Sequence, residues 1–198
     1  MSSTVRVIST LLLAILTMAC SARQAPHKPT DLSASRNGKT PWQIGAKSVG
    51  PITPGQPIPQ AAFQREGKDF DQLWTHQMAG LDEMSAMQRG LRDQDGFARV
   101  LFSKMDLSLQ LRSDLTVRTI WVGPTVRSAA GTGKGSTLSE IAAAHGALTK
   151  SDVPPPNLCS VTTATLPWVV FSFRESCRIL TQSSRVVRLF LMDPTADD

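Results

Sequence analysis

The sequence predicts an α+β fold in which an antiparallel sheet packs against two or three helices. Several short segments rich in β-branched and aromatic residues are separated by turn residues, which is typical of antiparallel strands. Only a few stretches combine helix-capping residues with a helical spacing of apolar side chains. About 150 residues remain after an export signal and a polar segment, which is enough for one domain with its own core.

The chain begins with an export signal. Arg6 is followed by an uncharged, mostly apolar run over residues 7–19. This run is shorter than the ~20 apolar residues of a membrane-spanning helix, so it indicates a signal peptide. Cys20 follows directly, and Leu16-Thr17-Met18-Ala19-Cys20 resembles the lipobox of bacterial lipoproteins.

The resemblance to bacterial lipoproteins implies that residues 1–19 are removed and that Cys20 is acylated, so that the lipid anchors the protein in a membrane. Thr17 departs from the Leu, Val or Ile that this family favours three residues before the cysteine. The alternative is an ordinary signal peptide cut after Ser21 or Ala22. Ser21 is not Asp, which by the sorting rule of enterobacteria implies the outer membrane, with the domain facing the periplasm of the cell envelope.

A polar segment over residues 20–47 is expected to be a disordered tether that carries the acylated cysteine. It contains prolines and few large apolar residues, so it cannot bury enough surface to offset the entropy lost on ordering. Trp42 is expected to be its first contact with the folded part. Residues 48–198 are expected to form a single α+β domain.

Two glycine-containing stretches suggest a weak internal duplication. Residues 50–63 and 131–144 each place a glycine turn before a capping position and a short helix with a small apolar face. Aligning Gly55 with Gly135 brings the two patterns into register. Chance similarity is the alternative, because few positions match.

The helix after the second glycine turn has clear end signals. Thr137 and Glu140 have the spacing of a capping box, and Gly146 suits the end of the helix. In the first stretch, Pro57 and Pro59 suit the first turn of a helix.

A second capping box, Asp69 with Gln72, predicts the start of an amphipathic helix. Large apolar residues then recur mostly at three- and four-residue steps. They are Phe70, Leu73, Trp74, Met78, Leu81, Met84 and Leu91. Trp74, Met78 and Met84 form either an adaptable binding surface or part of the core, and the core is the commoner role of such a stripe.

Six segments are predicted to be strands, namely residues 98–102, 107–111, 115–122, 161–165, 168–173 and 185–192. The second and third are expected to form a half-buried hairpin because their residues alternate between apolar and polar. The apolar set is Leu107, Leu109, Leu111, Leu115, Val117, Thr119 and Trp121. Trp121 and Trp168 are expected to pack inside.

The cysteine count suits an exported protein. If Cys20 is acylated, Cys159 and Cys177 remain as an even pair without the CxxC spacing of a redox or metal site. A structural disulfide is the favoured interpretation, and two buried free thiols are the alternative.

The region 115–192 has a strand, a glycine-rich loop, a helix and further strands in that order. With Gly133, Gly135, Thr137 and the cysteine pair, it resembles small envelope lipoproteins of unknown function and of the BamE-like kind. The resemblance implies duplicated helix-and-sheet units and implies no activity.

Several classes of function are disfavoured. The chain has 21 basic and 16 acidic residues, a net charge of +5 without a basic cluster, so we expect no nucleic-acid partner. The stretch 131–137 fails the P-loop pattern, because Ser128 and Gly135 stand where a glycine and a hydroxyl residue are required, so we expect no nucleotide. The three histidines lack metal-ligand spacing, and we expect no metal and no cofactor. His145 is expected to interact with the C-terminus of its own helix.

No acid–base or nucleophile pair is recognisable, so we do not expect an enzyme. The leading hypothesis is an envelope lipoprotein that binds an unidentified envelope protein or other component through a sheet edge or the methionine-rich helix. The alternatives are an immunity or inhibitor lipoprotein that neutralises a lytic effector in the periplasm, and a periplasmic hydrolase.

Overall fold

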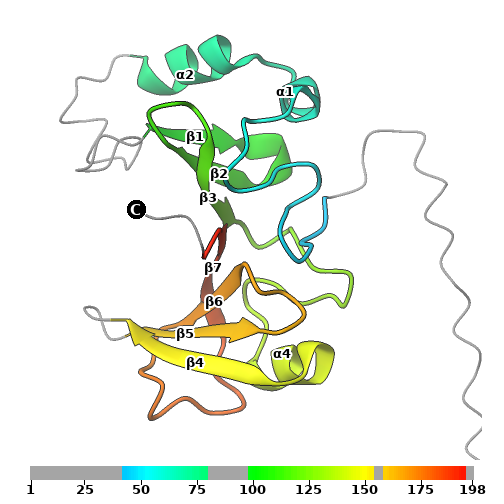
Figure 1. The fold of residues 1–198 in the computed structure, drawn as a ribbon, viewed down its shortest axis with the longest axis vertical. Coiled ribbons are helices and arrows are strands. Elements are labelled where there is room, and N and C mark those ends of the chain that lie inside the picture. The colour runs from blue at the N-terminus through cyan, green and yellow to red at the C-terminus, as the bar shows by residue number, and fades with distance from the viewer. Residues whose placement is uncertain (1–41, 80–97, 154–157, 195–198) are drawn as a thin grey trace, which may run out of the picture. The chain divides into compact units, whose positions relative to one another are not determined.

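The computed structural model describes residues 42–79, 98–153 and 158–194. Within them the chain forms one seven-stranded antiparallel sheet, three short α-helices and one 3-10 turn (Figure 1). The structure therefore has the expected antiparallel sheet with few helices, and the sheet dominates. None of the helices in the described part of the chain is long and apolar enough to span a bilayer.

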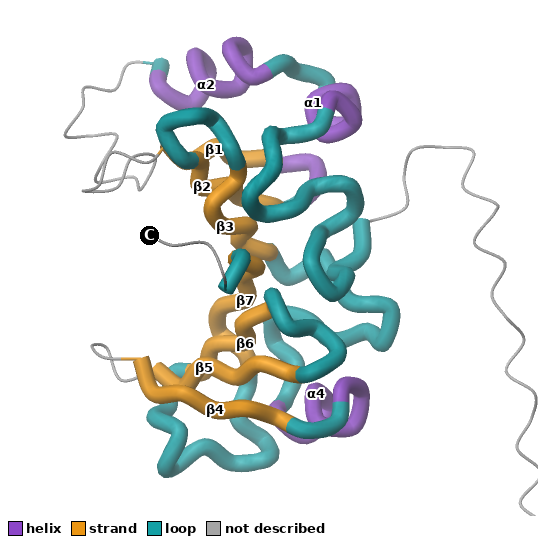
Figure 2. The backbone as a smooth tube through the Cα atoms, in the orientation of Figure 1, coloured by secondary structure: helices purple, strands orange, loops and turns teal. Residues whose placement is uncertain are grey.

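The strands lie in the order β1-β2-β3-β7-β6-β5-β4 across the sheet. Two antiparallel meanders, β1 to β3 and β4 to β7, meet where β3 pairs with β7 (strands are orange in Figure 2). The bounds are β1 (Ala98–Phe102), β2 (Leu107–Leu111), β3 (Val117–Val122), β4 (Leu148–Val153), β5 (Leu158–Thr163), β6 (Val169–Phe173) and β7 (Val186–Met192).

The helices are α1 (Gln60–Glu66), α2 (Phe70–Met78) and α4 (Leu138–His145), and the 3-10 turn η1 (Ser103–Met105) follows β1. Both predicted capping boxes are confirmed. In α2 the backbone N–H of the third helical residue donates to Asp69, and in α4 the corresponding N–H donates to Thr137. The predicted end of α4 at Gly146 is also confirmed, with a backbone N–H bond to Ala142.

The core lies on one face of the sheet. The alternation predicted for β2 is confirmed, because Leu107, Leu109 and Leu111 are buried while the two residues between them are half-buried. Buried side chains of the three helices belong to the same hydrophobic cluster as those of the strands. The largest fully buried side chains of the sheet are Phe102, Phe171, Phe173, Leu109, Leu111, Ile120, Leu189 and Leu191.

The strand β3 departs from the predicted alternation. A bulge shifts the register, because Gln110 pairs with Thr119 while Leu111 pairs with Val117. Leu115 has a φ of 65° and is 51% exposed, so it is not on the buried face. Trp121 is only half-buried, and its ring lies 4.8 Å from that of Phe190.

Trp168 also differs from its prediction. It precedes β6 rather than lying on it, and it is half-buried. The ammonium of Lys47 lies 5.1 Å from the centre of its ring, so the indole forms part of the surface.

One strand, β4, was not predicted. Its sequence LTKSDV lacks an alternating apolar pattern, and five of its six residues are exposed. It pairs along its whole length with β5 and forms an edge of the sheet. Backbone hydrogen bonds to β5 therefore hold β4 in place, and apolar side chains contribute little.

The packed region begins earlier than residue 48. Ile44 is 3% exposed, and its N–H donates to the carbonyl of Arg127 at 2.9 Å. Trp42 packs against the core cluster, as expected for the first contact. Residues 42–47 thus belong to the folded part, because one strongly apolar residue and backbone pairing offset the polar composition around it.

The opposite edge of the sheet is capped by a side chain. The amide of Gln77 on α2 donates to the carbonyl of Leu101 at 2.9 Å. The N–H of Leu101 donates back to the Gln77 oxygen at 3.1 Å. Gln77 therefore satisfies the two backbone groups of Leu101 that a further strand could use at this point of β1.

The two meanders begin their last strands with the same backbone contacts. Gly55 donates to the carbonyl of Val117 at 2.7 Å, and Val117 donates to Gln56 at 2.9 Å. The second half repeats both bonds at 2.9 Å through Gly135, Val186 and Ser136. The glycines aligned in the sequence therefore hold equivalent places at the starts of β3 and β7.

Further contacts match between the halves. A register shift at the start of β3 against β2 is repeated at the start of β7 against β6. The helices α1 and α4 each end at a glycine with a φ of 76°. The last residues of α1 and α4 are both polar: Glu66 binds Ser103 and Lys104 after β1, and His145 binds Thr165 after β5.

Candidate functional site

An open pocket of about 670 Å³ lies beside α4 and the glycine-rich loop that precedes it. We call it the arginine pocket. Its polar lining residues are Arg127, Thr132, Ser136, Glu140 and Arg185, and the rest of its lining consists of glycine and alanine. The pocket therefore combines small apolar walls with two guanidinium groups.

The loop that forms one wall is fixed by its own hydrogen bonds. The N–H of Thr132 donates to Ser128 Oγ at 3.2 Å, and that of Gly133 donates to Ser136 Oγ at 3.1 Å. The N–H of Gly135 is bonded to the start of β7. These amides are used inside the protein, whereas a P-loop directs its amides at a phosphate.

The two arginines reach the pocket from different parts of the chain. Arg127 donates to Ser136 Oγ at 3.4 Å, and Arg185, just before β7, donates to the carbonyl of Gly135 at 2.9 Å. A guanidinium has five N–H donors, many more than one such bond uses. Both side chains can therefore bind an anion while keeping their contacts with the loop.

Glu140 places one negative charge near the two cations. Its pKa is lowered mainly because the Thr137 N–H donates to the carboxylate, and the charges of Arg185 and Arg127 lower it further. The carboxylate is therefore ionised at neutral pH, and the capping bond holds it at the start of α4. With one carboxylate against two guanidinium groups, the pocket carries a net positive charge.

A series of hydrogen bonds connects the glycine-rich loop of the pocket to His145 at the end of α4. Ser128 Oγ lies 2.7 Å from Thr132 Oγ1, which lies 2.7 Å from His145 Nε2. His145 Nδ1 lies 3.2 Å from Thr165 Oγ1. His145 thus links the loop to the turn after β5, a longer-range role than the predicted one at its own helix end.

The contact between a threonine hydroxyl and an imidazole is the kind found in nucleophile–base pairs. Here the second ring nitrogen faces a hydroxyl and not a carboxylate. Thr132 is only 3% exposed, and its hydroxyl also bonds Ser128. These contacts cross-link the loop and the helix and give the Thr132 hydroxyl two partners within the protein.

We predict that the hydrogen bonds of His145 make the free energy of unfolding depend on pH. Burial lowers the pKa of His145. Its folded-state pKa therefore lies below the unfolded value of about 6.5, so its contribution is complete above that pH and is lost as the pH falls below it. Urea unfolding at pH 7.5, 6.5 and 5.5 should show a falling free energy of unfolding, with a smaller fall in His145→Gln. A His27→Gln variant controls for the loss of a histidine, and an unchanged fall in His145→Gln would contradict the assignment.

The structure shows where the predicted site residues lie. Trp74 and Met78 are half-buried on α2, and the Trp74 ring stacks with Phe70 at 6.4 Å. Neither lines the arginine pocket. Cys20 and Met84 lie outside the described residues, as do Leu81 and Leu91.

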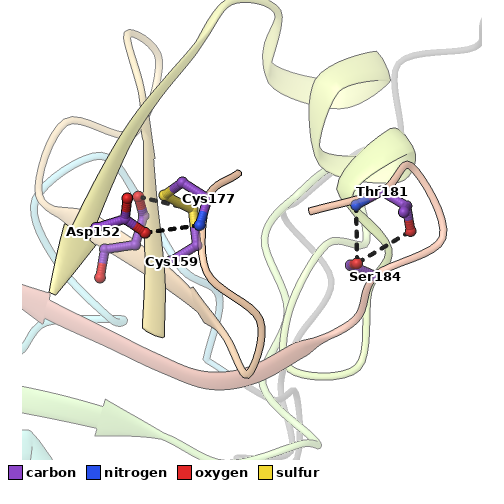
Figure 3. The surroundings of a disulfide bond; sticks show 6 residues. Asp152, Cys159, Cys177, Thr181 and Ser184 are labelled. Carbon is purple, nitrogen blue, oxygen red and sulfur yellow. Dashed lines mark hydrogen bonds between the residues drawn. A yellow bond between two sulfur atoms is a disulfide. The ribbon is translucent and has the colours of Figure 1, made fainter. Parts of the chain in front are cut away.

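The expected disulfide is present. Cys159 of β5 is bonded to Cys177, which follows β6, and the carboxylate of Asp152 accepts the Cys177 N–H at 2.7 Å (Figure 3). The disulfide thus ties the chain after β6 to β5, and the Asp152 bond ties it to the edge strand β4. Among residues 42–79, 98–153 and 158–194, no group of three or more His, Cys, Asp or Glu side chains could hold a metal ion.

Sequence reasoning did not find the arginine pocket. Arg127 and Arg185 are far apart in the sequence and stand in no motif. The glycine turn at 131–135 was the only local signal, and it pointed to a turn before a helix. The pairing of Gly135 with Val186 is what brings Arg185 to the loop.

No protein-family model matches this chain, and no curated protein matches it. Among solved structures, it is similar to the crystal structure of the uncharacterized protein yfeY from Escherichia coli. The identity is 12%, the match covers 76% of this chain and 99% of that chain, and the TM-score is 0.44.

Proposed function

We propose that this protein is an envelope lipoprotein that acts by binding another envelope component and not by catalysis. The arginine pocket carries the proposal. It is open, has small apolar walls and a net positive charge, and its buried hydroxyl–imidazole chain is bonded within the protein. These are the properties of a recognition site, because the pocket offers shape and charge to a ligand while the Thr132 hydroxyl is already bonded to Ser128 and His145.

The lipid anchor rests on the sequence. Cys20 follows an apolar run of the length of a signal peptide, within a segment that resembles a lipobox. An acylated Cys20 would place the domain at the membrane surface, at the outer membrane by the sorting rule. The disulfide agrees with an oxidising compartment outside the cytosol.

We also propose that the domain is an internal duplication. One unit contains α1 and the meander β1–β3, and the other contains α4 and β5–β7, with the helix of each packed on the sheet. The matched bonds at Gly55 and Gly135 support this, as do the repeated bulges and helix ends. Trp121 and Phe190 pair where the two units join.

The anchor is tested by mass spectrometry of the mature protein from its native membrane. We expect an N-terminal Cys20 that carries a diacylglycerol and an N-linked acyl chain. A Cys20→Ser variant should lose the lipid and leave the membrane fraction. An unmodified N-terminus at Ser21 or Ala22 would contradict the lipoprotein assignment.

Binding is tested by crosslinking the acylated protein in native membranes, followed by proteomics. We expect the same component to be recovered repeatedly from wild type and to be lost when Arg127 and Arg185 are both replaced by Gln. Arg178→Gln, an exposed substitution outside the pocket, is the matched control. Equal recovery from all three proteins would contradict a role for the pocket.

A further inference from the structure

The two glycine turns differ in what lies against them. In the first half, the ring of Trp42 packs so closely on Gly50 that no larger residue fits there. The guanidinium of Arg65 on α1 lies 5.1 Å from the centre of the same ring. Trp42 thus fills the space between the first turn and α1. In the second half, the alignment of Gly55 with Gly135 puts Ala130 at the position of Gly50, and Ala130 lines the open arginine pocket; a side chain added at the adjacent Gly131 would meet nothing within 4 Å.

The matched helix ends place the arginine pocket beside the residue that corresponds to Arg65. Gly67 donates to Phe63 and Gly146 donates to Ala142, each at the C-terminus of its helix. Counting back from the two glycines puts Ala144 where α1 has Arg65. Ala144 and the adjacent Ala143 line the arginine pocket. In the first half, Trp42 and Arg65 fill the space beside the helix. In the second half, alanines line this space and leave it open.

The second half also differs in charge. Pro57 forms a bridge with Thr116 before β3, and Thr137 forms the equivalent bridge with Arg185 before β7. Arg185 therefore stands where the first half has a neutral threonine. Together with Arg127 it borders the open space, and Glu140 offsets only one of the two charges.

We propose that the arginine pocket binds an acidic peptide segment of a partner protein through an aromatic side chain that takes the place equivalent to Trp42. Carboxylates beside that side chain pair with Arg127 and Arg185. The guanidinium groups can also stack on the face of an aromatic ring in a cation–π interaction, as Arg65 does on Trp42. The inference deepens the proposed binding function and does not depend on the lipid anchor.

The test measures binding of short fluorescein-labelled peptides to the full chain by fluorescence anisotropy. The probes are Gly-Asp-Trp-Asp-Gly, Gly-Asn-Trp-Asn-Gly and Gly-Asp-Ala-Asp-Gly. We expect the first to bind, and the neutral and the alanine peptides to bind about ten-fold more weakly, since each lacks one of the two recognised features. No binding of the first peptide, or equal binding of all three, would overturn the proposal.

Three variants locate the binding. Arg127→Gln combined with Arg185→Gln should weaken the first peptide about ten-fold, because the charges are lost. Ala144→Leu should weaken it at least as much by filling the pocket, and it keeps the test valid because residue 144 is exposed and tolerates a larger side chain. Arg178→Gln should bind like wild type. Unchanged binding in both pocket variants would overturn the proposal.

The outcomes separate this inference from the proposed function. The peptides could fail to bind while crosslinking in membranes still depends on the two arginines. That result would reject an acidic peptide as the ligand and would leave the proposed binding function intact. Loss of the lipid at Cys20 changes neither peptide experiment.

Discussion

Replacing Phe171 by alanine is expected to lower the free energy of unfolding by about 3–5 kcal/mol, the usual cost of a large cavity in a packed core. Phe171 is fully buried on β6, between Val161 of β5 and Leu189 of β7. Its ring centre lies 6.2 Å from that of His145, which in turn bonds Thr132 in the lining of the arginine pocket. Urea denaturation at pH 7.5, followed by circular dichroism, measures the change.

A matched variant on the other meander tests whether the sheet unfolds as one unit. Leu109→Ala on β2 removes a fully buried side chain of the same hydrophobic cluster and should cost about 2–5 kcal/mol. Both variants should unfold in one transition, because one core joins the two meanders. Leu101→Ala, at a residue 42% exposed, is the control with a smaller expected loss. Two separate transitions in either core variant would contradict a shared core.

Removing the disulfide is expected to lower the free energy of unfolding by about 3 kcal/mol. Cys159 and Cys177 are 18 residues apart, and chain entropy in the unfolded state gives roughly this value for such a loop. The variant Cys159→Ala with Cys177→Ala avoids leaving a reactive thiol. Chemical denaturation of this variant and of oxidised wild type measures the difference.

Reduced wild-type protein provides the control for the disulfide. It keeps both cysteine side chains and lacks only the covalent link between them. We expect reduced wild type to lose about as much stability as the double variant. Equal stability of the oxidised and reduced proteins would show that the covalent link contributes nothing.

Features that depend on neighbouring residues were predictable from the sequence. The capping boxes at Asp69 and Thr137 involve residues three positions apart, so their chemistry is visible in a short window. The alternation in β2 is equally local, since every second residue faces the core. The cysteine pair was predictable by arithmetic, because assigning Cys20 to acylation leaves only two of the three cysteines to be bonded.

Features set by pairing were not predictable. β4 is held to β5 by backbone bonds, and its exposed side chains show no pattern that marks a strand. The bulge at the start of β3 changes which side chains face the core, and this places Trp121 on the opposite side from the predicted one. A bulge depends on how two strands pair, so it cannot be predicted from the sequence of one strand alone.

The arginine pocket could not be predicted from the sequence for the same reason. Arg127 and Arg185 become neighbours only because β7 returns to the glycine-rich loop. The contrast with Trp42 likewise requires the two halves to be compared in space. The faint sequence similarity between residues 50–63 and 131–144 pointed to the right segments and gave no sign of how their surroundings differ.

The bond pair between Gln77 and Leu101 has a consequence for molecules held close together on one surface. An unprotected edge strand recruits strands from neighbouring copies, and crowding on a membrane would favour such fibril-like growth. On β1 the amide of Gln77 already meets the two exposed backbone groups of Leu101, as a neighbouring strand would. At the other edge, β4 carries the opposite charges of Lys150 and Asp152, which suit water better than a second sheet. We therefore expect copies of this domain at high density to resist pairing through this part of β1.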